Sequence, residues 1–443
     1  MTRVLVVSAE PVGERMAGPA IRALELARAL SAQCDVTLAA PPPSQAPLPL
    51  LEAGLADFDQ LLDAFRSHDV VVAQQLPAQL LRHLRRLPTR YVADLYNPLM
   101  IEVLEALDGS PGDSGTARRA ALGVLAQCAT ADFVICASEK QRDLWLGGMG
   151  VAGLVDVNSY AADPTYRSFI DVVPFGLPGE PPKRGPSGLK DALPGIGADD
   201  EVLLWGGGVW RWLDALTPIR ATGLLRAQGR PVHLVFQGIE RPSLEPDEVP
   251  TSAAEAIALA RELELEDSCV HFHHDWVPYE ERQSWLLDSD LGISAHSDHL
   301  EARFSFRTRV LDYLWAGLPV VTSSGDSIAE LVEREGLGRT VAPGDAEAFA
   351  AACAELLDDP EPAAERVRAT APRLRWSETA RPLVDYCLHH RERPVPRKDA
   401  AVIALATYGQ YPAIAAHLRE RRGPGEVARR LGRFVSRAVR HRG

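Results

Sequence analysis

Charged and hydroxyl side chains gather at the start of one predicted helix, at spacings suited to binding a phosphate group. Ser305 is a suitable N-cap, and Thr308, Arg309 and Asp312 share one arc of the helix with it. The N-terminus of a helix presents free N–H groups, and Arg307 and Arg309 lie beside it. We therefore expect this helix to bind an anion, and a diphosphate fits such a site. Asp312, one turn further along, is placed to accept hydrogen bonds from sugar hydroxyls.

The same stretch predicts how these side chains are positioned. Val310, Leu311 and Leu314 share an apolar arc that should face a sheet. Gly317, followed two residues later by Pro319, is a strong signal for the end of the helix. The two valines after the proline then begin a buried strand.

The segment that follows Asp312 resembles a known sequence signature. Its ending, Trp315-Ala-Gly-Leu-Pro-Val-Val321, is similar to the donor-binding signature of GT-B glycosyltransferases, specifically the large retaining class called family 4. Two acidic residues precede this ending in the family. Asp312 occupies the second acidic position, whereas the first falls on Phe304, and Glu301 is the nearest substitute. The resemblance implies that Asp312 holds ribose hydroxyls and that Glu301 contacts the transferred sugar.

The resemblance implies further contacts to the donor. In the family, the glycine turn represented here by Gly207 and Gly208 is followed by an arginine and a lysine that hold the diphosphate. Arg211 lies close to the arginine position, and Asp214 stands near the lysine position. Because a buried diphosphate needs cationic partners, we assign that role to Arg307 and Arg309, which we also count among the catalytic residues together with Glu301 and Asp312. The other donor-binding residues that the resemblance implies are Trp276, Val277, Ser305, Phe306 and Thr308.

Strand-sized apolar runs alternate with helical patterns in two successive series. The first series of strands is predicted at residues 4–8, 36–40, 69–73, 91–94 and 131–138, and the resemblance implies a hinge strand that begins at residue 170, at the domain boundary. The second is predicted at residues 202–205, 232–236, 270–272, 291–294 and 320–321. Continuous apolar runs favour parallel sheets that are covered on both faces. We therefore predict an α/β protein with two doubly wound, Rossmann-like domains facing a cleft, which is the GT-B fold.

The predicted domain boundaries follow from this alternation and from the resemblance. Residues 1–175 should form an N-terminal Rossmann-like domain on the acceptor side, and residues 176–375 a C-terminal one on the donor side. Residues 376–392 should form a helix that crosses back to the first domain, and residues 393–443 a C-terminal extension. The cleft between two such domains is the natural ligand site.

Three residues of the first domain are candidates for the acceptor side. Gly18 lies in a glycine-containing loop similar to one that lines the cleft in GT-B enzymes, although a plain strand–helix turn explains the loop equally well. Arg22 lies in the helix that follows. Asp94 ends a strand at the edge of a parallel sheet where ligands bind, and capping the next helix is an alternative role for it.

Charge and hydropathy limit the partners. The net charge of −13 argues against nucleic acid, and the longest apolar runs are strand-sized, so we expect a cytoplasmic protein without a transmembrane helix. Residues 417–443, by contrast, contain nine Arg and two Glu. Within them, residues 424–443 form a basic amphipathic pattern, which predicts either attachment to an anionic membrane, on its inner face, or docking on the acidic body of the enzyme.

The predicted function is transfer of a sugar from a nucleotide-activated donor, with retention of configuration. We expect neither a cofactor nor a metal, because arginines and a helix N-terminus meet the diphosphate charge. The acceptor is open, with lipid-linked and small natural-product acceptors both compatible. The alternatives are a pseudo-glycosyltransferase coupling an activated cyclitol, a nucleotide-sugar epimerase, and a non-catalytic protein that binds sugar nucleotides.

Overall fold

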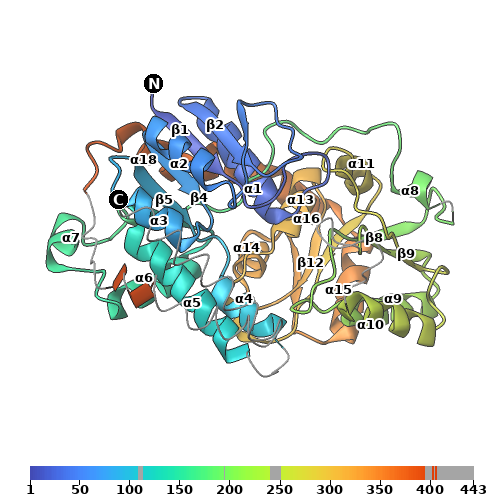
Figure 1. Ribbon diagram of the computed structural model, residues 1–443. Helices are drawn as coiled ribbons and strands as arrows, with labels where there is room; N and C mark the ends of the chain where they lie inside the picture. The colour runs from blue at the N-terminus through green and yellow to red at the C-terminus, as the bar shows by residue number, and fades with distance from the viewer. Residues whose placement is uncertain (108–112, 194, 240–250, 395–401, 404, 407–443) are drawn as a thin grey trace, which may run out of the picture.

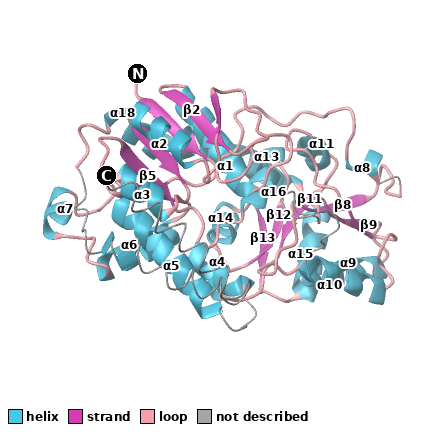
Figure 2. Cartoon of the chain, viewed as in Figure 1, coloured by secondary structure: helices cyan, strands magenta, loops and turns pink. Residues whose placement is uncertain are grey.

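The computed structural model of this chain describes residues 1–107, 113–193, 195–239, 251–394, 402–403 and 405–406. It contains two parallel sheets, each covered by helices, in two domains that lie side by side (Figures 1 and 2). This confirms the prediction of two doubly wound α/β domains. The basic segment at residues 424–443, predicted to be an amphipathic helix, lies outside the described residues.

The first domain has a seven-stranded sheet in the order β3-β2-β1-β4-β5-β6-β7. Its strands are β1 (Arg3–Val7), β2 (Asp35–Ala40), β3 (Leu50–Glu52), β4 (Val70–Ala73), β5 (Arg90–Asp94), β6 (Phe133–Cys136) and β7 (Ile170–Val172). Its helices are α1 (Gly18–Ser31), α2 (Phe58–Ser67), α3 (Ala78–Leu84), α4 (Leu99–Ala106), α5 (Asp113–Thr130), α6 (Glu139–Val151) and α7 (Val157–Ala162). The central strands are buried along nearly their whole length, as the continuous apolar runs predicted.

The second domain has a six-stranded sheet in the order β10-β9-β8-β11-β12-β13. Its strands are β8 (Glu201–Trp205), β9 (Val232–Phe236), β10 (Val270–Phe272), β11 (Leu291–Ser294), β12 (Val320–Ser323) and β13 (Gly338–Val341). The helices from α8 onward are α8 (Leu189–Ala192), α9 (Leu216–Ala227), α10 (Thr251–Glu262), α11 (Arg282–Leu287), α12 (Leu300–Phe304), α13 (Thr308–Ala316), α14 (Ser327–Glu335), α15 (Ala346–Asp358), α16 (Glu361–Thr370), α17 (Trp376–Thr379) and α18 (Arg381–His389).

Two edge strands, β3 and β13, were not predicted. β3 has only three residues, none of them buried, so it lacks the apolar run by which the other strands were recognised. In β13 the two middle residues, Arg339 and Thr340, are not buried, and the apolar pattern is interrupted there. Edge strands have a neighbour on one side only, which relaxes the demand for apolar side chains.

The chain crosses between the domains twice, and the two crossings run side by side. The N–H group of Leu177 donates to the carbonyl of Leu374 (2.7 Å), and that of Trp376 donates to the carbonyl of Leu177 (3.0 Å). A Cβ atom on Gly176 would lie 2.6 Å from the backbone of Trp376, so only glycine allows this approach. Helix α18 then packs on the first domain (Figure 1), and in this contact the ring of Tyr386 stacks on that of Phe133.

Candidate active site

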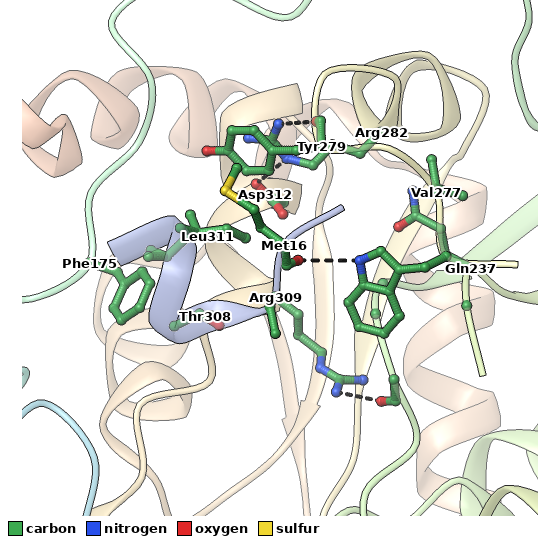
Figure 3. Close-up of a pocket in the computed structure, with 18 of the residues that line it drawn as sticks. Met16, Phe175, Gln237, Val277, Tyr279, Arg282, Thr308, Arg309, Leu311 and Asp312 are labelled. Carbon is green, nitrogen blue, oxygen red and sulfur yellow. Dashed lines mark hydrogen bonds and ion pairs between the residues drawn. The ribbon is translucent and has the colours of Figure 1, made fainter. Parts of the chain in front are cut away.

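A cavity lies between the two domains, where loops at the carboxyl ends of both sheets meet (Figure 3). Ligands of open parallel sheets bind at this edge. The cavity is lined by Met16, Ala17, Gly18, Ile21, Phe175, Gly176, Pro178, Gly206, Gly207, Gly208, Trp210, Gln237, Gly238, Trp276, Val277, Tyr279, Arg282, Thr308, Arg309, Leu311, Asp312 and Trp376. Both domains therefore contribute residues to one cavity.

Helix α13 presents its first turn to this cavity. It ends at Gly317, which has a φ of 80°, so the predicted stop is confirmed. Its start differs from the prediction, because the N-cap is Arg307 and not Ser305. Ser305 is instead the C-cap of the preceding short helix α12, where its hydroxyl donates to the carbonyl of Ala302. The first helical residue, Thr308, lines the cavity, whereas Ser305 and Phe306 are not among the lining residues.

Arg309 is a cationic side chain of the cavity with unused hydrogen-bonding capacity. Its Nη2 donates to the carbonyl of Gly208 (2.9 Å), and its guanidinium carbon lies 4.6 Å from the ring centroid of Trp205. Its Nη1 is buried and has no hydrogen-bond partner among the described residues. Burial lowers the pKa of Arg309 to about 10, so it remains charged at neutral pH. A buried cation with a free donor can bind an anionic ligand.

The glycine turn after β8 lines the cavity beside α13. Gly207 has a φ of 76°, which favours glycine, and Gly206 donates its N–H to the hydroxyl of Tyr313 (2.7 Å). Arg211 is exposed and is not among the residues that line the cavity. Asp214, near the position of the family's lysine, accepts the N–H groups of residues 216 and 217 at the start of α9. Asp214, which precedes the N-cap Ala215, thus satisfies free N–H groups at the start of α9, and this role explains an acidic residue there.

Asp312 lies in the cavity beside an arginine that the sequence analysis did not single out. Its Oδ1 accepts a hydrogen bond from Nε of Arg282 (3.2 Å), while 40% of its side chain remains exposed (Figure 3). The guanidinium of Arg282 also lies 3.6 Å from the ring centroid of Tyr279. These contacts fix Asp312 in an orientation that leaves acceptor capacity for hydroxyl groups.

The far end of the cavity is formed by Trp276, Val277 and Gln237. The indole Nε1 of Trp276 donates to the carbonyl of Met16 (3.2 Å), which joins the second domain to the loop before α1 (Figure 3). Gln237 follows β9 directly, and its Nε2 is buried without a hydrogen-bond partner among the described residues. The cavity thus contains a second unused donor besides Arg309.

Glu301 and Arg307 contact each other outside the cavity lining. Nη2 of Arg307 lies 2.7 Å from Oε2 of Glu301, and the two side chains are 6% and 1% exposed. Burial raises the pKa of Glu301, and the charge of Arg307 opposes that shift. On the other side, Nε of Arg307 lies 3.6 Å from Oδ2 of Asp326, which also lies 3.6 Å from Nε2 of His296. Of the two arginines assigned to the phosphates, the structure brings only Arg309 to the cavity.

The acceptor-side candidates also form a pair. Gly18, the first residue of α1, lines the cavity. Arg22 and Asp94 are 0% and 2% exposed, with Nε to Oδ2 at 2.6 Å and Nη2 to Oδ1 at 2.8 Å. The alternative role of Asp94 as a helix cap was wrong, because the N-cap of α4 is Pro98 and the carboxylate of Asp94 faces Arg22.

Three polar side chains that line the cavity were not predicted from the sequence, namely those of Gln237, Tyr279 and Arg282. Gln237 has a recognisable signal, because it is the polar residue that directly follows a buried strand. Tyr279 and Arg282 are three positions apart, the spacing at which an aromatic ring and a guanidinium can stack, but that spacing is too common to predict a site. No group of three His, Cys, Asp or Glu in the described part of the chain is arranged to hold a metal ion, and none of its helices is long and apolar enough to cross a membrane.

Comparison with known proteins places the fold. Residues 201–359 match the family model described as glycosyl transferases group 1. A UDP-forming alpha,alpha-trehalose-phosphate synthase from Burkholderia xenovorans is similar in structure, with a TM-score of 0.64, 14% identity, and coverage of 88% of this chain and 99% of that one. The structure of HepE of Anabaena in complex with UDP and glucose is also similar. Its TM-score is 0.62 and its identity 14%, and the match covers 87% of this chain and 99% of that one. A sucrose-phosphate synthase from Thermosynechococcus elongatus is similar with a TM-score of 0.59 and 17% identity, and the match covers 88% of this chain and 99% of that one. No curated protein matches the sequence.

Proposed function

We propose that this chain is a GT-B glycosyltransferase that binds a nucleoside diphosphate sugar in the cavity between its domains and transfers the sugar to an acceptor. The observation that carries the proposal is the pair of buried, unused donors on Arg309 and Gln237. Buried donors without partners destabilise a protein, and an oxygen-rich diphosphate would satisfy them. The glycine turn at residues 206–208 leaves room for such a group close to Arg309.

Each of these residues then contacts a different part of the donor. Arg309 and the N–H groups of the first turn of α13 meet the diphosphate and stabilise the charge that it gains as it leaves. Asp312 holds the ribose hydroxyls, and the backbone at Trp276 and Val277 contacts the base. Because Glu301 can reach a sugar only if its ion pair with Arg307 opens, we assign Glu301 and Arg307 to positioning α12 and α13.

Uridine is the nucleoside that we propose for the donor. HepE of Anabaena was solved with UDP and with UDP-glucose, and the similar trehalose-phosphate synthase is UDP-forming. We expect calorimetric titration to show saturable binding of UDP, with weaker binding of GDP and TDP. Failure of all three nucleotides to bind would contradict the proposed function.

Retention of configuration is proposed from the resemblance to family 4, and product analysis tests it together with the alternatives. A glycosyltransferase forms a glycoside with the anomeric configuration of the donor. A pseudo-glycosyltransferase would instead join a cyclitol to its acceptor, and an epimerase would consume the donor without any acceptor. A binding protein would show neither transfer nor hydrolysis.

Activity should withstand chelation of divalent metal ions. The charge of Arg309 and the N-terminus of α13 together can offset the diphosphate charge that Mg²⁺ offsets in other transferases. We expect initial rates in excess EDTA to equal those without it. A loss of activity that Mg²⁺ or Mn²⁺ restores would contradict the proposal, and a buffer of matched ionic strength is the control.

A further inference from the structure

A second cavity, of about 360 Å³, lies within the first domain between α3, α4 and α5, and we call it the α3–α5 cavity. Its size falls within the range of small-molecule sites. Most of its lining is apolar and includes Leu55, Leu76, Pro77, Leu99, Val103 and Ala120. A polar member of its floor, Gln127, already exchanges hydrogen bonds with the backbone of Leu76 and the hydroxyl of Tyr91. An apolar occupant would therefore leave no unpaired group at Gln127.

Helix α4, one wall of this cavity, is more apolar than its burial explains. Six of its eight residues are apolar, with the sequence LMIEVLEA, yet only Ile101 is buried. Leu99 and Val103 line the cavity, and Leu104 is 54% exposed. A surface helix normally places its apolar residues against the core. Apolar side chains around an apolar cavity indicate that the ligand itself is apolar where it contacts α4.

Helix α5 supplies one positive charge to the lining of the cavity. Arg119 of α5 lines the cavity and has no hydrogen bond or ion pair with any other described residue. An unpaired arginine at the border of an apolar cavity can bind an anionic group without losing another partner. The lining thus matches an amphiphile that has an apolar chain and one acidic group.

The α3–α5 cavity opens on the same sheet edge as the donor cavity. Strands β1, β4 and β5 are neighbours, and the loops after their carboxyl ends contribute to the two cavities. Nε2 of Gln74, after β4, donates to the carbonyl of Pro19 beside the donor cavity (2.8 Å). After β5, Tyr96 packs on Phe175 of the donor cavity, and Leu99, three residues later, lines the α3–α5 cavity. Three residues span at most about 11 Å.

We infer that the α3–α5 cavity binds the apolar chain of a lipid phosphate acceptor, that is, an acceptor that carries a lipid chain, a phosphate group and a free hydroxyl. The phosphate faces Arg119, and the hydroxyl that accepts the sugar extends toward the donor cavity. This inference rests on the proposed function, because it names the class of the second substrate. Apolar burial in the cavity supplies affinity, and the arginine selects the anionic head.

Binding of n-dodecyl phosphate, a simple lipid phosphate, tests the inference. Below its micellar concentration, calorimetric titration should show saturable binding of one molecule per chain. Gly123 lines the cavity, and a Cβ added there meets no atom within 4 Å, so Gly123→Phe should fill the space and weaken binding by about tenfold or more. Phenylalanine is a better helix former than glycine, so the helix should persist, and the melting temperature checks this.

Matched variants separate the apolar and the charged contribution. Gly147→Phe replaces an exposed glycine of α6 that has equally free space and should leave binding unchanged. Arg119→Gln should weaken the binding of n-dodecyl phosphate by about tenfold. It should leave the binding of hexaethylene glycol dodecyl ether, an uncharged amphiphile, unchanged. Inorganic phosphate alone should not bind measurably.

Equal affinity of the wild-type chain and Gly123→Phe for n-dodecyl phosphate would overturn the inference. So would wild-type binding that never saturates, or inorganic phosphate binding as tightly as the lipid phosphate. UDP titrations on the same samples distinguish the two proposals. Wild-type chain that binds UDP but not n-dodecyl phosphate would contradict only the acceptor class, whereas failure to bind any nucleotide would contradict the proposed function itself.

Discussion

Replacing Arg309 by alanine should lower kcat and raise the donor KM, with kcat/KM for the donor falling about 10- to 150-fold. Hydrogen bonds from a guanidinium to a phosphate are among the stronger ones in proteins, and Arg309 has a buried Nη1 available for one. The diphosphate gains charge as the sugar departs, so this contact should strengthen in the transition state. Initial-rate measurements at varied donor concentration separate the two constants.

Two variants serve as comparisons for Arg309→Ala. Asp312→Asn changes a contact to ribose, which does not react, so it should raise the donor KM and leave kcat nearly intact. Arg303→Ala removes an exposed arginine that lies outside the cavity and should change neither constant. If Arg309→Ala retains both wild-type constants, the donor does not bind at α13 and the assignment of the cavity is wrong.

Replacing Arg22 by methionine should destabilise the first domain by about 3–5 kcal/mol. The two charges are both buried and joined by two hydrogen bonds, so removal of the arginine leaves the carboxylate of Asp94 buried without its partner. The guanidinium also donates to the carbonyl of Val173 (2.8 Å), close to the crossing between the domains. Urea unfolding followed by circular dichroism measures the loss.

The pH dependence of this loss identifies its cause. Burial already raises the pKa of Asp94, and removing Arg22 should raise it further above the value in the unfolded chain. A carboxyl group whose pKa is higher in the folded than in the unfolded chain lowers the stability of the folded state as the pH rises and the group ionises. The stability lost in Arg22→Met should therefore be largest at neutral pH and should shrink as the pH falls. Arg22→Met/Asp94→Asn should recover part of the lost stability.

A surface pair provides the matched control for that experiment. Arg3 is half-exposed and lies 3.6 Å from Asp69, so Arg3→Met should cost no more than about 1 kcal/mol. If Arg22→Met cost as little, the pair would not hold β5 in place. Arg22 and Asp94 would then be better explained as acceptor contacts, which is the role predicted for them from the sequence.

Local signals predicted the end of α13 correctly but not its beginning. A glycine with a left-handed conformation is required at the C-terminus of many helices, and Gly317 with the nearby Pro319 satisfies that requirement within a few residues. Ser305 has the right chemistry for an N-cap, but it is the C-cap of α12, and α13 begins only at Thr308. Helix α12 is only five residues long and is too short to show a helical period.

The two arginines at the start of α13 show why a charged residue near a motif is not yet a ligand contact. Arg307 and Arg309 are two positions apart, which separates them by about 200° on a helix, so they cannot both face one ligand from its first turn. Arg307 instead pairs with Glu301, six residues earlier, across the turn that ends α12. That pairing depends on a chain reversal that no spacing in the sequence predicts.

Sequence alone determined the two parallel sheets, because strands covered on both faces must be apolar along their length, and it determined the end of α13. It also indicated the cavity loops, because a glycine turn follows β8 and a helix N-terminus follows the short segment after β11. Only the tertiary structure decided which polar groups are satisfied within the protein. Arg22 and Asp94 meet from positions 72 residues apart, and Arg309 keeps a free donor because no carboxylate in the described residues folds against it. Hydrogen-bond and charge partners depend on distances between remote segments, which periodicity along the chain does not encode.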